Sequence, residues 1–152
     1  MCIRDRYIDP GFYDVMERRL RAPGDFAQAY VLAHEVGHHV QNLIGSSNLN
    51  TRGETSNQNS VRVELQADCL SGVWVNKEKQ KRPNFLEEGD IDAALQTANA
   101  IGDDTLQRKS QGRVVPDSFT HGSAEQRKRW FMTGYQSGSV QACNTFAPGV
   151  RL

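Results

Sequence analysis

Apolar residues recur every three or four positions along most of the chain, and this spacing predicts a protein built of helices. The most apolar stretch is FAQAYVLAHEVGHHVQNLIG, residues 26–45. Asp25 and Gln28 form a capping-box pattern at its start, and Gly45 should end it. Because its apolar surface is so wide, we expect this helix to lie mostly buried.

The same periodicity, with caps, glycines and prolines at the ends, predicts four further helices. They cover residues 9–20, 60–80, 91–101 and 124–135. Ser123 and Gln126 form a second capping-box pattern before the last of them. A short helical turn is expected over residues 103–110. The expected fold class is therefore mainly α, with the helices 26–45 and 60–80 packed together at the centre.

The remaining segments are polar or rich in glycine and proline, and they should form loops. Residues 46–59 read as a surface loop, residues 112–119 as extended or irregular chain, and the tail after Gly138 as loop. No internal repeat or domain boundary is evident, so one domain is expected over residues 7–147.

Charge and composition exclude some classes of protein. The chain has 152 residues, 18 Lys+Arg and 18 Asp+Glu, so its formal net charge is zero. This balance argues against a surface for nucleic acid or anionic membrane, which would need an excess of basic residues. A hydrophobic content of 38% is ordinary for a globular chain, so the chain is expected to be soluble.

The N-terminal residues look foreign to the domain. No apolar run approaches the roughly 18 to 20 residues that span a bilayer, and MCIRDR, residues 1–6, lacks the apolar core of a signal peptide. These six residues resemble the translation of a sequencing-adapter end. We therefore expect residues 1–6 to be non-native and the native N-terminus to be missing.

The cysteines leave two readings open. The chain contains Cys2, Cys69 and Cys143, and no C-x-x-C motif that would suggest a zinc finger. If Cys2 is foreign, the remaining pair is either a disulfide or two buried thiols. Cys69 is expected to act as a small buried apolar group rather than as a nucleophile.

The chemistry of the chain centres on an H-E-x-x-H motif formed by His34, Glu35 and His38. Residues four apart lie on one face of a helix, so the two imidazoles can bind one metal ion. Glu35 lies about 100° round the helix axis, within reach of a water on that metal. His39 points about 100° away from His38 and is not expected to be a ligand.

Two imidazoles and one carboxylate suit Zn²⁺, with a fourth position left for water. Glu64 is the candidate third ligand, because an unpaired Glu on a buried face of helix 60–80 would be costly. Asp68, one turn further on, should accept the other ring N–H of a ligating histidine. The reverse assignment, with Asp68 as ligand and Glu64 as its support, is the alternative.

These residues together support hydrolysis of an amide bond. Zinc lowers the pKa of a bound water and polarises a carbonyl, and Glu35 would take the water's proton and pass it to the leaving amine. His121, just before the last helix, is the candidate donor to the oxyanion. Arg127 could orient His121 or help to bind the substrate backbone.

The chain resembles a known family, the bacterial neutral zinc metallopeptidases of the YpfJ type. The matching stretches are FAQAYVLAHEVGHHVQNLIG, VELQADCLSGVW, IGDDTLQ and SFTHGSAEQRKRWFMTGY. The run ELQAD, residues 64–68, is similar to the E-x-x-A-D of the wider gluzincins, including the CAAX prenyl proteases. That resemblance implies a zincin-like fold, Glu64 as third ligand, and His121 and Arg127 as a catalytic pair.

The resemblance also bears on location. Members of the family usually carry an N-terminal transmembrane segment and place the peptidase domain outside the cytoplasm. The full-length protein is therefore expected to be anchored by a single N-terminal span and to be extracytoplasmic.

The leading hypothesis is a zinc metallopeptidase that acts on a peptide or protein substrate. A non-catalytic, zinc-stabilised binding module is one alternative, although such a module would not need Glu35. An amidase acting on cell-wall peptides is another, and the spacing of the motif does not separate the two hydrolases.

Overall fold

The computed structural model describes residues 11, 14, 18 and 25–152 of the chain. The helix predicted over residues 9–20 falls largely outside these described residues, as do residues 1–6. The described part is helical and contains no strand, which confirms the mainly α fold class. None of its helices combines the length and the apolar character needed to cross a membrane.

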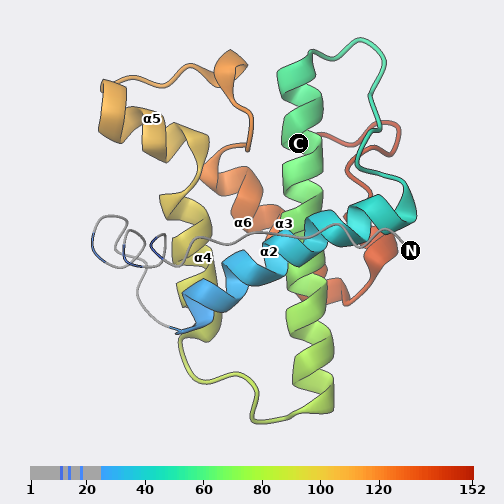
Figure 1. Cartoon of the computed structure of the whole chain (residues 1–152), viewed down its shortest axis with the longest axis vertical. Helices are drawn as coiled ribbons and strands as arrows, with labels where there is room; N and C mark the ends of the chain where they lie inside the picture. The colour runs from blue at the N-terminus through green and yellow to red at the C-terminus, as the bar shows by residue number, and fades with distance from the viewer. Residues whose placement is uncertain (1–10, 12–13, 15–17, 19–24) are drawn as a thin grey trace.

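Two long helices form the centre of the fold. Helix α2 spans Asp25–Ile44, and α3 spans Ser56–Lys81. In Figure 1, α2 crosses α3 near the middle of α3. Gly37 allows this close crossing, since a Cβ at that position would lie 2.9 Å from the carbonyl oxygen of Ala67. The crossing brings the H-E-x-x-H motif of α2 against the middle of α3.

The start of α3 differs from the prediction. The helix was expected to begin at Ser60, but it begins at Ser56 because Thr55 is a true N-cap. The Thr55 hydroxyl accepts a hydrogen bond from the Gln58 backbone N–H, and the Gln58 side chain accepts one from the Thr55 N–H at 2.8 Å. This capping box compensates for the polar sequence of the first turn, which carries no apolar periodicity.

Two of the other helices lie where the sequence predicts them, whereas the third and two 3₁₀ segments differ from the prediction. Helix α4 spans Asp90–Ala100, and α6 spans Ala124–Ser137 with the expected Ser123 and Gln126 capping box. Helix α5, Asp103–Gln111, is a complete helix rather than a short turn. Two 3₁₀ segments, η1 (Pro116–Ser118) and η2 (Val140–Cys143), occupy stretches that were expected to be irregular.

The core lies on both sides of α3. One cluster joins α3 to α6 and the C-terminal segment, through residues that include Leu65, Val73 and Trp130. A second cluster joins α2, α4 and α6 around Tyr30 and Phe131. Helix α3 packs most extensively against α6 and α2, so it connects the two clusters of the core.

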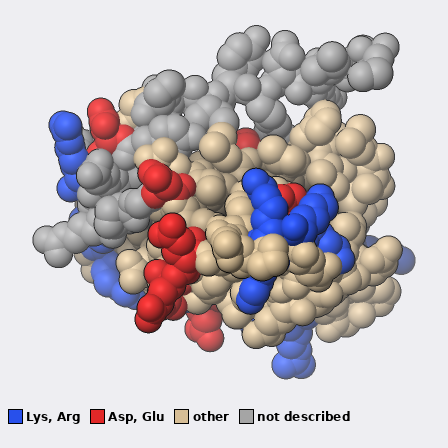
Figure 2. Space-filling model, turned by 90° about the horizontal axis from the view of Figure 1, so that it is seen from below, with Lys and Arg blue, Asp and Glu red and all other residues tan. Residues whose placement is uncertain are grey.

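Charged side chains of both signs occur on the face shown in Figure 2. One cluster of basic groups lies near the centre with an acidic group among them, and the acidic groups to its left have further basic groups beside them. The described surface on this side therefore has no continuous stripe of one sign.

Candidate metal centre

The crossing of α2 and α3 places the three predicted metal ligands side by side. The Nε2 atom of His34 lies 3.1 Å from Oε2 of Glu64, and Nε2 of His38 lies 3.4 Å from Oε1 of the same carboxylate. The two imidazole rings are 4.7 Å apart at their centres. One nitrogen from each ring and a carboxylate oxygen are therefore directed at a common point.

Glu35 also lies beside this point. The potential ligand atoms of His34, Glu35 and His38 all fall within 4.8 Å of one another. The Glu64 carboxylate contacts the Nε2 atoms of both histidines. Two carboxylates, one from α2 and one from α3, therefore lie beside the two imidazoles. His39 is partly buried and lies outside this group.

The other ring nitrogen of His34 is held by Asp68. The distance from His34 Nδ1 to Asp68 Oδ1 is 2.7 Å, and Asp68 is completely buried. Because the carboxylate can only accept, Nδ1 carries a proton, and Nε2 is the nitrogen that would bind a metal. The hydroxyl of Tyr30 donates to the same Oδ1 at 2.6 Å.

The electrostatics of the cluster follow from burial and pairing. Burial by itself lowers the pKa of His34, but the Asp68 carboxylate raises it to about 9. Burial raises the pKa of Glu64, yet hydrogen bonds from His34 and His38 hold it well below its usual range. Without metal, the proton between His34 and Glu64 therefore stays on His34, and a divalent cation at Nε2 would displace it.

Arg127 lies behind His34, and its side chain is 4% exposed. It donates from Nε to Asp68 Oδ2 and from Nη2 to Asp68 Oδ1, both at 2.9 Å. Burial raises the pKa of Asp68, but Arg127 and His34 together lower it below its usual value. The sequence suggested that Arg127 would orient His121 or bind substrate, whereas these bonds direct its guanidinium to Asp68.

His121 is the exposed member of the candidate site, with 53% of its side chain accessible. Its Nδ1 lies 3.2 Å from Oδ1 of Asp103, at the start of α5. The other oxygen of Asp103 accepts backbone N–H groups from Thr120, His121 and Gly122. The hydrogen bond to Asp103 raises the pKa of His121, burial lowers it, and the nearby Glu64 charge raises it further.

Three supporting residues were missed by reasoning from the sequence. Tyr30 and Gln41 lie on α2 one turn from the histidines they support, and their spacing could have identified them. Asp103 could not have been found in this way. Its pairing joins the start of α5 to His121, 18 residues further on, in the loop before α6, and that loop has no periodic pattern.

The family description "Putative neutral zinc metallopeptidase" matches residues 1–146. The chain belongs to this family. The protein YpfJ of Escherichia coli (strain K12) is 53% identical over 150 residues, which make up 95% of this chain and 52% of that protein. Rv2575 of Mycobacterium tuberculosis (strain ATCC 25618 / H37Rv) is 44% identical over 151 residues, 93% of this chain and 52% of its own length.

This chain thus spans about half the length of the curated relatives it matches. Both relatives are uncharacterized proteins, so their names carry no activity. No solved structure matches the chain.

Proposed function

We propose that this chain forms the peptidase domain of a zinc-dependent metallopeptidase, which hydrolyses peptide bonds with Glu35 as the general base. The observation that carries the proposal is the position of Glu64, whose carboxylate reaches the Nε2 atoms of both motif histidines. Two imidazole nitrogens and a carboxylate are a donor set that Zn²⁺ prefers at catalytic sites. His34, His38 and Glu64 would hold the ion.

Zinc bound there would activate a water and polarise the scissile carbonyl. Glu35 accepts the proton of the attacking water and delivers it to the amine that leaves. His121 donates a hydrogen bond to the oxygen that becomes negative as the carbonyl carbon turns tetrahedral. Asp103 holds the ring of His121 in place and favours its protonated form.

Asp68, Tyr30 and Arg127 act on His34 and not on the substrate. Asp68 fixes the tautomer of His34, while Arg127 and Tyr30 satisfy the remaining lone pairs of the buried carboxylate. Arg127 is therefore a positioning residue in this proposal. His34 is held so that its Nε2 atom lies 3.1 Å from Oε2 of Glu64, beside the proposed zinc position.

For the whole protein we propose an extracytoplasmic location with a membrane anchor outside the described domain, as the family resemblance implies. The disulfide between Cys69 and Cys143 supports this location, because disulfides persist in oxidising compartments. The proposed substrate is a peptide or protein.

The test is zinc content by mass spectrometry and casein cleavage by the purified chain, with Glu35→Gln as the decisive variant. We expect one zinc per chain in both forms and a loss of cleavage of at least ~100-fold in Glu35→Gln. Zinc-free protein, or equal cleavage by both forms, would contradict the proposal. Zinc binding without any cleavage would favour a binding module, and release of cell-wall peptides alone would favour the amidase.

A further inference from the structure

His38 is held by a different set of residues from His34. Its Nδ1 lies 2.8 Å from Oε1 of Gln41, three residues further along α2. Gln41 is completely buried, and its amide nitrogen donates to the carbonyl of Val63 at 2.7 Å and to Oε1 of Gln66 at 2.9 Å. Both amide hydrogens of Gln41 are thereby used.

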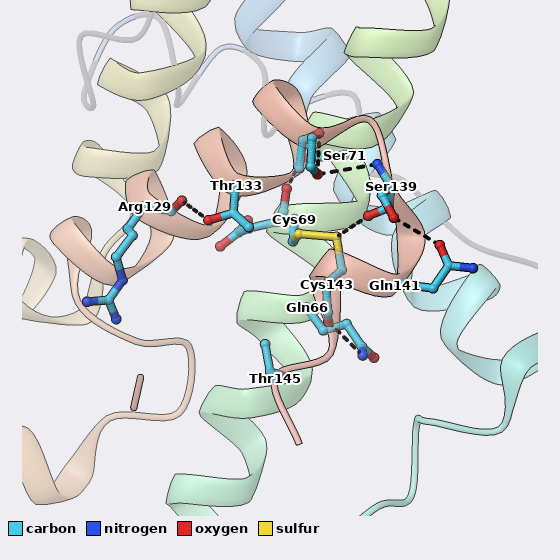
Figure 3. The surroundings of a disulfide bond; sticks show 12 residues. Gln66, Cys69, Ser71, Arg129, Thr133, Ser139, Gln141, Cys143 and Thr145 are labelled. Carbon is cyan, nitrogen blue, oxygen red and sulfur yellow. Dashed lines mark hydrogen bonds between the residues drawn. A yellow bond between two sulfur atoms is a disulfide. The ribbon is translucent and has the colours of Figure 1, made fainter. Parts of the chain in front are cut away.

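Gln66 continues this chain of hydrogen bonds into the C-terminal segment. Its side-chain nitrogen donates to the backbone carbonyl of Cys143 at 3.0 Å, and its oxygen accepts a hydrogen bond from Ser46 at 2.6 Å. Figure 3 shows Gln66 beside the backbone of Cys143, next to the disulfide that joins Cys143 to Cys69. Cys143 is 1% exposed and Gln66 is 4% exposed, so water does not compete for these bonds.

The orientation of each amide in this series of hydrogen bonds is determined by the backbone carbonyl to which it donates. The carbonyls of Cys143 and Val63 can only accept, so each must face an amide N–H₂ group. If Gln41 were reversed, its oxygen would face the carbonyl oxygen of Val63, and two buried acceptors would be left opposed. The oxygen of Gln41 must therefore point at His38.

We propose that Gln41 and Gln66 are positioning residues that fix the tautomer of His38, with the disulfide-held carbonyl of Cys143 as the fixed end of the relay. With Nδ1 donating to Gln41, Nδ1 carries a proton, and Nε2, which lies 3.4 Å from Oε1 of Glu64, is the nitrogen left to bind a metal. This inference rests on the proposed zinc site. It differs from the support of His34, which uses a charged carboxylate, because here two neutral amides transmit the orientation.

The two histidines are consequently supported by neighbouring residues of α3. Asp68 supports His34. Cys69, the next residue, forms the disulfide with Cys143. The carbonyl of Cys143 accepts from Gln66 and so orients the amides that support His38. A displacement of the C-terminal segment at Cys143 would therefore alter the orientation of His38 through Gln66 and Gln41, although this segment does not itself bind the metal.

The direct test is ¹⁵N NMR of the metal-free Glu64→Ala chain, at a pH where His38 is neutral, which reports which ring nitrogen carries the proton. Because this variant lacks the carboxylate that competes for a proton on Nε2, we expect the proton on Nδ1, and a mixture of tautomers when Gln41→Leu is added. A His38 with its proton on Nε2 in the Glu64→Ala chain would overturn the proposal. This readout needs no zinc, so it remains decisive even if the chain proves not to be a zinc enzyme.

Zinc affinity, measured by competition with a chromophoric chelator, gives the second readout. We expect Gln41→Leu to weaken zinc binding by ~10- to 100-fold and Gln66→Leu by about 10-fold. The matched control is Thr97→Val, a buried residue whose hydroxyl donates to the Ala93 carbonyl within α4. The zinc affinity of this variant should change less than about twofold. Wild-type affinity in both glutamine variants, with a weakened Glu64→Gln, would also overturn the relay.

Discussion

At the scale of single residues, Asp68 is a completely buried carboxylate, and its hydrogen bonds offset the cost of removing its charge from water. Its two oxygens accept bonds from Tyr30, from His34 and from two nitrogens of Arg127. A buried ion pair adds little net stability, but removal of one partner leaves the other charge uncompensated. The pair therefore serves the geometry of His34 more than the stability of the fold.

The variant Arg127→Met tests this interpretation. It should lower the free energy of unfolding by ~3 to 5 kcal/mol, because Asp68 would remain buried without its cation. Urea denaturation of the metal-free protein measures the change. Arg129→Met, at an exposed position two residues further along α6, is the control and should change it by less than ~0.5 kcal/mol. Equal effects of the two variants would contradict the role given to Arg127.

His121 gives the second prediction at this scale. Its pKa is raised above 6.5 mainly by Asp103, so Asp103→Asn should lower that pKa, as followed by NMR titration of the ring protons. Since the folded-state pKa is raised, the ion pair stabilises the fold fully below about pH 6.5 and loses this contribution as the pH rises through the raised pKa.

The control for His121 is Asp104→Asn. Asp104 is the neighbouring carboxylate, and it accepts the backbone N–H of Ala124 instead of bonding to His121. It should leave the pKa of His121 nearly unchanged. A pKa that does not respond to Asp103→Asn would show that another charge sets it.

At the scale of elements, the sequence predicts most helices because their signals are local. The caps and periodicity gave α2, α4 and α6 with small errors at their ends. The start of α3 was predicted late, since its first turn is polar and only the Thr55 capping box marks it. The nine-residue α5 was expected as a turn, because it has a single large apolar residue, Leu106.

The disulfide could not be predicted, because it depends on a tertiary contact between residues 74 positions apart. A cross-link over such a loop restricts the unfolded chain, so removing it with Cys69→Ala and Cys143→Ala should lower the free energy of unfolding by roughly 4 kcal/mol. Urea denaturation of the metal-free double variant measures this. A change below about 1 kcal/mol would show that the packing of η2 on α3 holds the segment without the bond.

At the scale of the whole molecule, the site is assembled from three segments: α2 supplies His34, Glu35 and His38, α3 supplies Glu64, and the loop before α6 supplies His121. Helical spacing predicted the α2 residues, and the cost of an unpaired buried carboxylate, together with the family resemblance, pointed to Glu64. The placement of Arg127 at Asp68 could not be derived from spacing, because it depends on how α6 packs against α3. The metal-ligand roles of His34, His38 and Glu64 remain predictions that the geometry supports.

The most direct test is a crystal structure of the zinc-loaded chain with anomalous data collected at the zinc absorption edge. Our account predicts one strong anomalous peak bound by His34 Nε2, His38 Nε2 and a Glu64 oxygen at about 2.0 to 2.2 Å, with the fourth position open to solvent. A peak bound through the Nδ1 atoms, a site without Glu64, or a fourth protein ligand that closes the site would contradict it.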